Sequence, residues 1–263
     1  MKARNEGDNI ATKGFTLMEL SIVLILTALI SATIMTALDH LSISKAQHIV
    51  QQTSKFRIAV TSFMEKYDYL PGDFPDEHNL LPGNPWGGDG NGQLEFVSWN
   101  QYEPVLFWQH LALAKMIGGS YTGTIIGADV YVSGVNIPES IIKATAWNTL
   151  HTRNISMGGA NPDPDDPSSF WSDPQTGIYG RVDNVLELSS PNTSALKGAS
   201  LNPPTAWAVD NKIDDGGATS GNMYSTNPTI TGATGCVGDG TSQTGYNLSN
   251  EKVQCSLYFW LTY

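Results

Sequence analysis

Basic side chains are scarce in this chain, which has 14 Lys and Arg against 25 Asp and Glu in 263 residues, a formal net charge of −11. A protein that binds nucleic acid needs a basic face to displace counterions from the phosphates. The composition therefore argues against nucleic acid as a partner. With 40% apolar residues, the chain can nevertheless bury the core of a folded domain.

The sequence also lacks the common catalytic motifs. It contains no Gly-x-Ser-x-Gly element, no Walker phosphate loop and no His-Glu-x-x-His pair, and its five histidines are scattered. An enzyme needs a nucleophile with a base, a set of metal ligands, or a loop that holds a phosphate. We therefore expect a protein that is not an enzyme.

Glycine and proline are missing from one long stretch, although the whole chain has 26 Gly and 14 Pro. Neither occurs in the 56 residues from Phe15 to Leu70, and Leu20 to Leu38 is a run of 19 uncharged residues. As a helix this run would be about 28 Å long, close to the roughly 30 Å thickness of a bilayer's hydrocarbon core. We therefore predict a transmembrane helix over residues 15–38.

The charges on either side of this run predict its orientation. Lys2, Arg4 and Lys13 precede it, whereas Asp39 and His40 follow it. Basic residues are enriched on the cytoplasmic side of membrane helices. We therefore expect a single-pass protein with a cytoplasmic N-terminus and an exported C-terminal part.

The segment Gly14-Phe15-Thr16-Leu17-Met18-Glu19-Leu20, between a polar leader and an apolar run, resembles the N-terminal motif of the type IV prepilin family. This family includes type IV pilins and the pseudopilins of type II secretion systems. The resemblance implies that residues 1–14 are a leader, that prepilin peptidase cleaves after Gly14, and that the new terminus at Phe15 is N-methylated. It places the protein in a bacterial inner membrane, on an assembly platform, with pilin or pseudopilin subunits as partners.

Glu19 is the acidic fifth residue of the mature chain in this comparison. A charged carboxylate in an apolar helix costs about 2.5–3.5 kcal/mol at the bilayer centre. Pairing with the Phe15 ammonium of a neighbouring subunit would offset that cost and set the register of assembly. The alternative is a plain signal anchor whose Glu19 side chain reaches the lipid headgroups.

The helical pattern continues beyond the apolar run. Ile49, Phe56, Phe63 and Leu70 recur every seven residues, which predicts an amphipathic continuation over residues 39–70 with one buried face. Pro71 ends it, because the residue before a proline is disfavoured in the helical region.

Residues 71–263 are rich in turn residues and are predicted to form a periplasmic globular domain. The fold class is α+β: a long N-terminal helix, transmembrane in its first half and amphipathic in its second, packed on a pilin-like domain with an antiparallel sheet and long loops. Within this domain the sequence predicts a helix at 104–116 and short strands at 130–132, 180–182, 206–209 and 255–261.

Only two cysteines are present, Cys236 and Cys255, and they enclose 18 residues. An exported domain faces an oxidising compartment, and neither a Cys-x-x-Cys pair nor a cluster of histidines accompanies them. We therefore predict a disulfide.

Two acidic stretches are candidate calcium sites, because calcium prefers carboxylate and carbonyl oxygens. The first, Gly88 to Glu95, resembles a calcium loop only at its beginning. The second gathers Asp210, Asp214 and Asp215 within six residues and is the preferred candidate. Related pseudopilins carry calcium in their globular domains. The alternative is that both stretches are solvated turns.

Together these features predict a minor subunit of a type II secretion pseudopilus or a type IV pilus; the sequence does not separate the two systems. The alternative is a membrane-anchored periplasmic binding protein, for instance one that binds glycans, that does not polymerise. The seven tryptophans fit either a sugar-binding surface or, more commonly, a core.

Overall fold

The computed structural model describes residues 14–75, 81, 86–98, 101–125, 131–152, 183–192, 195–227, 235–238 and 245–261, without the side chains at 32–41, 96–98, 101, 191, 192 and 195–197. The chain divides into two compact units, residues 1–41 and 42–263. The predicted leader, apart from Gly14, lies outside the described residues.

Helix α1 (Leu17–Tyr67) begins in the first unit and ends in the second. It fills most of the stretch that lacks glycine and proline. The helix ends where Asp68 takes a left-handed conformation, with φ of 62°, and donates its N–H to the Met64 carbonyl at 2.9 Å. Pro71 then prevents a further turn.

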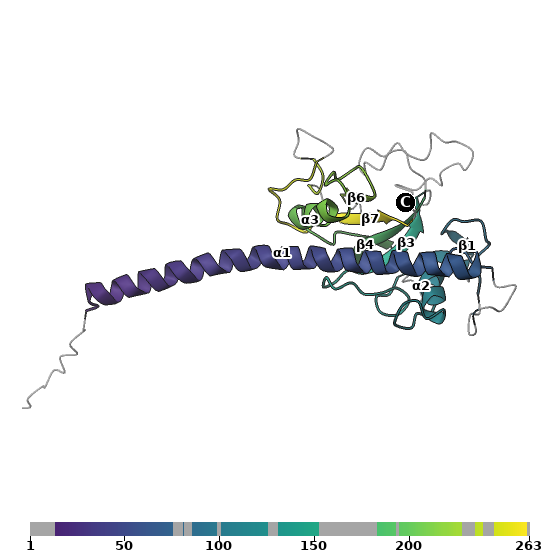
Figure 1. Cartoon of the computed structure of the whole chain (residues 1–263), viewed down its shortest axis with the longest axis horizontal. Helices are drawn as coiled ribbons and strands as arrows, with labels where there is room; N and C mark the ends of the chain where they lie inside the picture. The colour runs from purple at the N-terminus through teal and green to yellow at the C-terminus, as the bar shows by residue number, and fades with distance from the viewer. Residues whose placement is uncertain are drawn as a thin grey trace, which may run out of the picture. The chain divides into compact units, whose positions relative to one another are not determined.

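In the second unit, α1 packs one face into the domain. The buried apolar residues of this face are Ala46, Ile49, Phe56, Ala59, Val60 and Phe63. The Phe56 ring centroid lies 5.0 Å from that of Trp108 in helix α2 (Glu103–Leu113) and 5.5 Å from that of Trp147 in strand β3 (Ala146–His151). This half of α1 therefore lies between α2 and the sheet (Figure 1).

Arg57 provides a polar connection between α1 and the sheet. It is buried, and its Nε and one terminal nitrogen donate to the carbonyl oxygen of Trp260 at 2.9 and 2.7 Å. The same terminal nitrogen lies 3.4 Å from the Asn222 carbonyl oxygen. Hydrogen bonds from charged donors are stronger than neutral ones, so Arg57 fixes the rotation of α1 against the end of the sheet.

The main sheet is antiparallel. Its strand order is β3, β4 (Asn184–Asn192), β7 (Ser256–Trp260) and β6 (Met223–Thr226), and β5 (Ala195–Gly198) pairs with β4. The last strand of the chain therefore inserts between two earlier ones. Strands β1 (Phe96–Ser98) and β2 (Gln101–Tyr102) form a separate two-stranded sheet.

The side chains of the sheet divide between two faces. Leu186 and Leu188 of β4 and Leu257 and Phe259 of β7 belong to the main core beneath α1. The alternate residues, including Tyr258, form a smaller apolar cluster on the other face. Side chains that alternate between two faces are typical of an extended strand, and here both faces of the sheet are covered.

The α+β class and the antiparallel sheet are confirmed. The helix predicted at 104–116 is α2, and the strand predicted at 255–261 is β7. The strand predicted at 206–209 is wrong, because these residues belong to helix α3 (Pro203–Ile213). Residues 131 and 132 are not a strand, whereas 130 and 180–182 lie outside the described residues.

The start of α3 explains this error. The Asn202 side chain accepts a hydrogen bond from the Thr205 N–H at 3.2 Å, and Pro203 occupies the first helical position. Both features favour a helix N-terminus. These local signals outweigh the strand preference of the apolar residues that follow.

Candidate functional site

The predicted cleavage position lies in an open segment before α1. A Cβ atom added to Gly14 would meet no atom within 4 Å, and the adjacent Phe15 side chain is 84% exposed. Gly14, Phe15 and Thr16 precede the first helical residue, Leu17. Within the described part of the chain, nothing therefore crowds the peptide bond after Gly14.

Glu19 occupies the first turn of α1 and is hydrogen-bonded within it. Its Oε2 accepts from the Thr16 backbone N–H at 2.8 Å and from the Thr16 hydroxyl at 2.9 Å, and the Glu19 N–H donates to the Thr16 hydroxyl at 3.2 Å. These reciprocal bonds form a capping box, which satisfies free N–H groups at a helix start. The Thr-x-x-Glu spacing is the sequence signal for it, and the role of Thr16 was missed.

The first unit presents a continuous apolar helix surface around Glu19. Eleven large apolar side chains are exposed there: Phe15, Leu17, Met18, Leu20, Ile22, Val23, Leu24, Ile25, Leu26, Leu29 and Ile30. The predicted membrane segment also includes residues 32–38, whose side chains lie outside the described part. Among the described residues, no helix combines the length and apolarity needed to cross a membrane.

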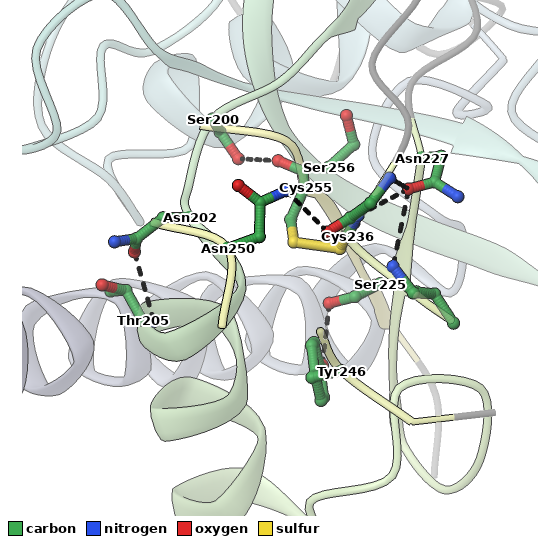
Figure 2. Close-up of a disulfide and its surroundings, with 12 residues drawn as sticks. Ser200, Asn202, Thr205, Ser225, Asn227, Cys236, Tyr246, Asn250, Cys255 and Ser256 are labelled. Carbon is green, nitrogen blue, oxygen red and sulfur yellow. Dashed lines mark hydrogen bonds between the residues drawn. A yellow bond between two sulfur atoms is a disulfide. The ribbon is translucent and has the colours of Figure 1, made fainter. Parts of the chain in front are cut away.

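The predicted disulfide is confirmed: Cys236 and Cys255 are bonded, and both are fully buried. The Cys255 carbonyl accepts from the backbone N–H groups of Ser200 and Leu201, at 2.7 and 3.2 Å. The Cys236 N–H donates to the side-chain oxygen of Asn227 at 2.7 Å (Figure 2). Closing a loop of this length stabilises a domain by about 3 kcal/mol in the chain-entropy model.

The structure brings Asp210, Asp214 and Asp215 together, with one carboxylate oxygen of each within 4.8 Å of the others. Asp210 is buried in α3 and accepts from the Tyr246 hydroxyl at 2.6 Å and the Gly216 N–H at 3.2 Å. Burial raises the pKa of Asp210 to about 7, and the neighbouring carboxylates contribute in the same direction. This cluster therefore favours either a proton or a cation.

The two other carboxylates of this cluster also hold the loop after α3. Asp214 accepts from the N–H groups of Asn222 and Met223. Asp215 accepts from the Gly217 N–H and the Ser220 hydroxyl, both at 2.8 Å, and these bonds lower its pKa. The carboxylates thus have structural partners of their own, and the calcium assignment stays a prediction.

A second cluster joins Asp73, Asp89 and Glu103, whose carboxylate oxygens also lie within 4.8 Å of one another. Asp73 is buried and accepts from the N–H groups of Gly90 and Gly92, at 2.8 and 2.7 Å. Both glycines have positive φ, which aims their N–H groups at one carboxylate. The loop of residues 88–95 therefore wraps around Asp73 instead of forming an isolated calcium loop.

Glu103 completes this second cluster from the start of α2. It is fully buried and accepts from the N–H groups of Asp89 and Glu95, at 3.1 and 2.9 Å. Burial raises the pKa of Glu103 to about 8 and that of Asp73 to about 6. Sequence reasoning named the Asp89 loop but missed Asp73 and Glu103, because no local motif links them to it.

His110 holds the chain after α1 against α2. It is fully buried, and its Nδ1 accepts from the Gly72 N–H at 3.0 Å, which leaves Nε2 as the protonated nitrogen. Burial lowers the pKa of His110 to about 4. This neutral histidine is a structural residue, and its contribution to stability is lost as the pH falls from about 6.5 to 4.

We expect Asp210→Asn to raise the melting temperature relative to the wild type by an amount that grows from pH 5 to pH 8. The folded-state pKa of Asp210 lies above its ordinary 3.8, so its stabilising contribution is lost as the pH rises through about 7. Asparagine keeps an acceptor for Gly216 and cannot ionise. A relief of 1 kcal/mol would raise the melting temperature by about 2–4 °C.

The control for this experiment is Asp215→Asn, since the pKa of Asp215 is lowered and its replacement should not stabilise the domain at pH 8. Melting scans at pH 8 with calcium and with a chelator test the calcium hypothesis at the same time. Bound calcium would raise the wild-type midpoint. An unchanged midpoint removes that hypothesis, and an equal effect of both variants contradicts the assigned charge state of Asp210.

Comparison of the chain with protein-family models, with curated proteins and with solved structures finds no match.

Proposed function

We propose that this protein is a minor subunit of a filament, either the pseudopilus of a type II secretion system or a type IV pilus. The observation that carries the proposal is in the first unit, where exposed large apolar side chains surround the Glu19 carboxylate at the start of α1. Such a surface requires lipid or other apolar helices around it. The role is structural and not enzymatic.

In this proposal the protein passes through two environments. Before assembly, residues 15–38 lie in the bacterial inner membrane, with the N-terminus in the cytoplasm and residues 71–263 in the periplasm. The Cys236–Cys255 disulfide supports an oxidising compartment for the globular domain. On assembly, the apolar half-helices leave the lipid and pack against the same half-helices of neighbouring subunits. Their exposed apolar side chains stay in apolar surroundings throughout.

Cleavage prepares the chain for assembly. Prepilin peptidase removes residues 1–14 and methylates the amine of Phe15, which remains cationic. The Glu19 carboxylate, now bonded to Thr16, can also accept the ammonium of an adjacent copy. A desolvated pair of this kind contributes to the register more than to adhesion.

Mass spectrometry of the native protein, extracted from membranes, tests this proposal. We expect a chain of 249 residues that begins with methylated Phe15, since 14 of the 263 residues are removed. A variant with a bulky residue at Gly14 should keep the leader, because the added side chain would fill the open space beside the peptide bond that the peptidase must reach. A native chain that begins at Met1, or a Phe15 terminus without a methyl group, contradicts it.

A further inference from the structure

An apolar groove runs along the outer face of α1 in the second unit. It has a volume of about 480 Å³, and its lining includes Val50, Ser54, Lys55, Ile58 and Met116. Ile58 is 67% exposed, although Phe56, two residues earlier, is buried in the core. Since a helix turns about 100° per residue, Ile58 faces away from the domain. The groove thus lies beside the face that packs into the domain, and the buried Ala59 borders both.

The charge of this half of α1 differs from that of the whole chain. Residues 42–67 carry four cations, Lys45, Lys55, Arg57 and Lys66, against one carboxylate, Glu65, a net charge of +3 in a chain of net charge −11. Arg57 is buried, but Lys55 is exposed and lines the groove. A surface with an exposed apolar side chain beside a lysine fits an acidic partner.

The same chain offers a surface of complementary charge in the loop of residues 88–95. Residues 89–92 are all exposed, and Asp89 lies among them. The buried carboxyl groups of Asp73 and Glu103 lie close to the Asp89 carboxylate, and Glu95 is a second acidic residue of the same loop. Among the described residues, a Cβ atom at Gly92 would meet nothing within 4 Å, so there is free space beside the loop at this position.

The other acidic cluster is a poorer counterpart. Asp210 is buried beneath the Tyr246 hydroxyl, and the exposed Lys212 lies between it and Asp214 in the sequence. The cation of Lys212 lowers the net negative charge of that surface. The 88–95 loop has no basic residue within it.

We propose that the groove on α1 of one copy binds the 88–95 loop of a second copy, with Ile58 as the apolar anchor and Lys55 facing Asp89. The groove and the loop are different surfaces of one chain, so the contact is heterologous. A bound pair of copies still has one free groove and one free loop, so such contacts continue from copy to copy unless a rotation closes a ring. This contact deepens the proposed filament function and rests on it for its setting.

Cross-linking of the full-length protein in membranes and in detergent tests this contact. Both native cysteines are in the disulfide, so added cysteines are the only free thiols. Ser54→Cys in the groove combined with Gln93→Cys in the loop should give a ladder of oligomers with a short bis-maleimide. Ser54→Cys combined with the exposed Lys143→Cys is the matched pair and should give none.

Two further variants test the chemistry of the contact. In the Ser54→Cys/Gln93→Cys background, Lys55→Glu and Ile58→Ser should each lower the ladder about tenfold, as loss of an interface anchor does. Lys143→Glu should leave the ladder unchanged, and Asp89→Lys should restore part of what Lys55→Glu removes. Melting midpoints of each variant show whether the domain is still folded.

The outcomes separate this inference from the proposed function when filaments are measured in parallel by sedimentation. Filaments without a ladder overturn the inference and leave the filament function standing. A ladder without filaments supports the contact and counts against the filament function. An equal ladder from the matched pair overturns the contact, whatever the filament content.

Discussion

Replacing Glu19 by alanine should remove the protein from filaments and leave the globular domain folded. Glu19 lies in the first unit, whereas the core of the domain is built from residues 46 to 261. Breaking a buried ion pair costs about 3–5 kcal/mol, because the remaining charge is left without a partner. Incorporation should therefore fall by about 10² to 10⁴-fold, as measured by immunoblots of sedimented filaments.

Thr16→Ala is the matched control for this substitution. It removes the hydroxyl of the capping box but keeps the Thr16 backbone N–H and the Glu19 carboxylate. Loss of a helix N-cap costs only about 1 kcal/mol. Incorporation should thus decrease far less than in Glu19→Ala. Normal incorporation of Glu19→Ala would contradict the role of this residue and favour a membrane-anchored protein that does not polymerise.

Replacing Phe56 by alanine should lower the free energy of unfolding of the domain by about 3–5 kcal/mol. The Phe56 ring makes edge contacts with Trp108 and Trp147, and all three side chains are buried. Alanine would leave a cavity between α1, α2 and the sheet, which those large rings cannot fill. Thermal unfolding of the full-length protein in detergent, followed by near-UV circular dichroism, measures the effect as a drop of about 10 °C or more.

Ile58→Ala is the control for Phe56→Ala, since it truncates a large apolar side chain on the same helix that is 67% exposed. Substitutions at such surface positions change stability by about 0.5 kcal/mol or less. Equal losses from the two variants would contradict the packing of α1 described above. A stable Phe56→Ala variant would show that α1 contributes little to the domain.

Several contacts that hold α1 on the domain join residues far apart in the sequence. Arg57 reaches the carbonyl of Trp260 across 203 positions, and Trp147 donates to the side chain of Gln52 at 3.2 Å across 95. The seven-residue spacing of apolar residues predicts that one face of the helix is buried. It contains no information on which strand covers that face, because many strands of similar composition would cover it equally well.

The two acidic clusters show the same limit of prediction from sequence. Asp210, Asp214 and Asp215 are near one another because they lie within six residues at the end of α3. Asp73, Asp89 and Glu103 meet only because α2 returns beside the end of α1, where the Gly88–Glu95 loop closes over both. Their convergence depends on how the domain packs and not on their spacing in the sequence.

The sequence alone determined the features that depend on local conformation or on exclusion: the long helix, the α+β class, and the disulfide between the only two cysteines. It predicted the end of the helix at residue 70, three residues beyond the observed end at Tyr67. The tertiary structure decided the position of β7 between β4 and β6, the burial of Arg57, the second carboxylate cluster and the groove beside Ile58. The physical reason is that backbone preference and side-chain period act within a few residues. Partners across the sheet and the core are selected by the packing of the whole domain.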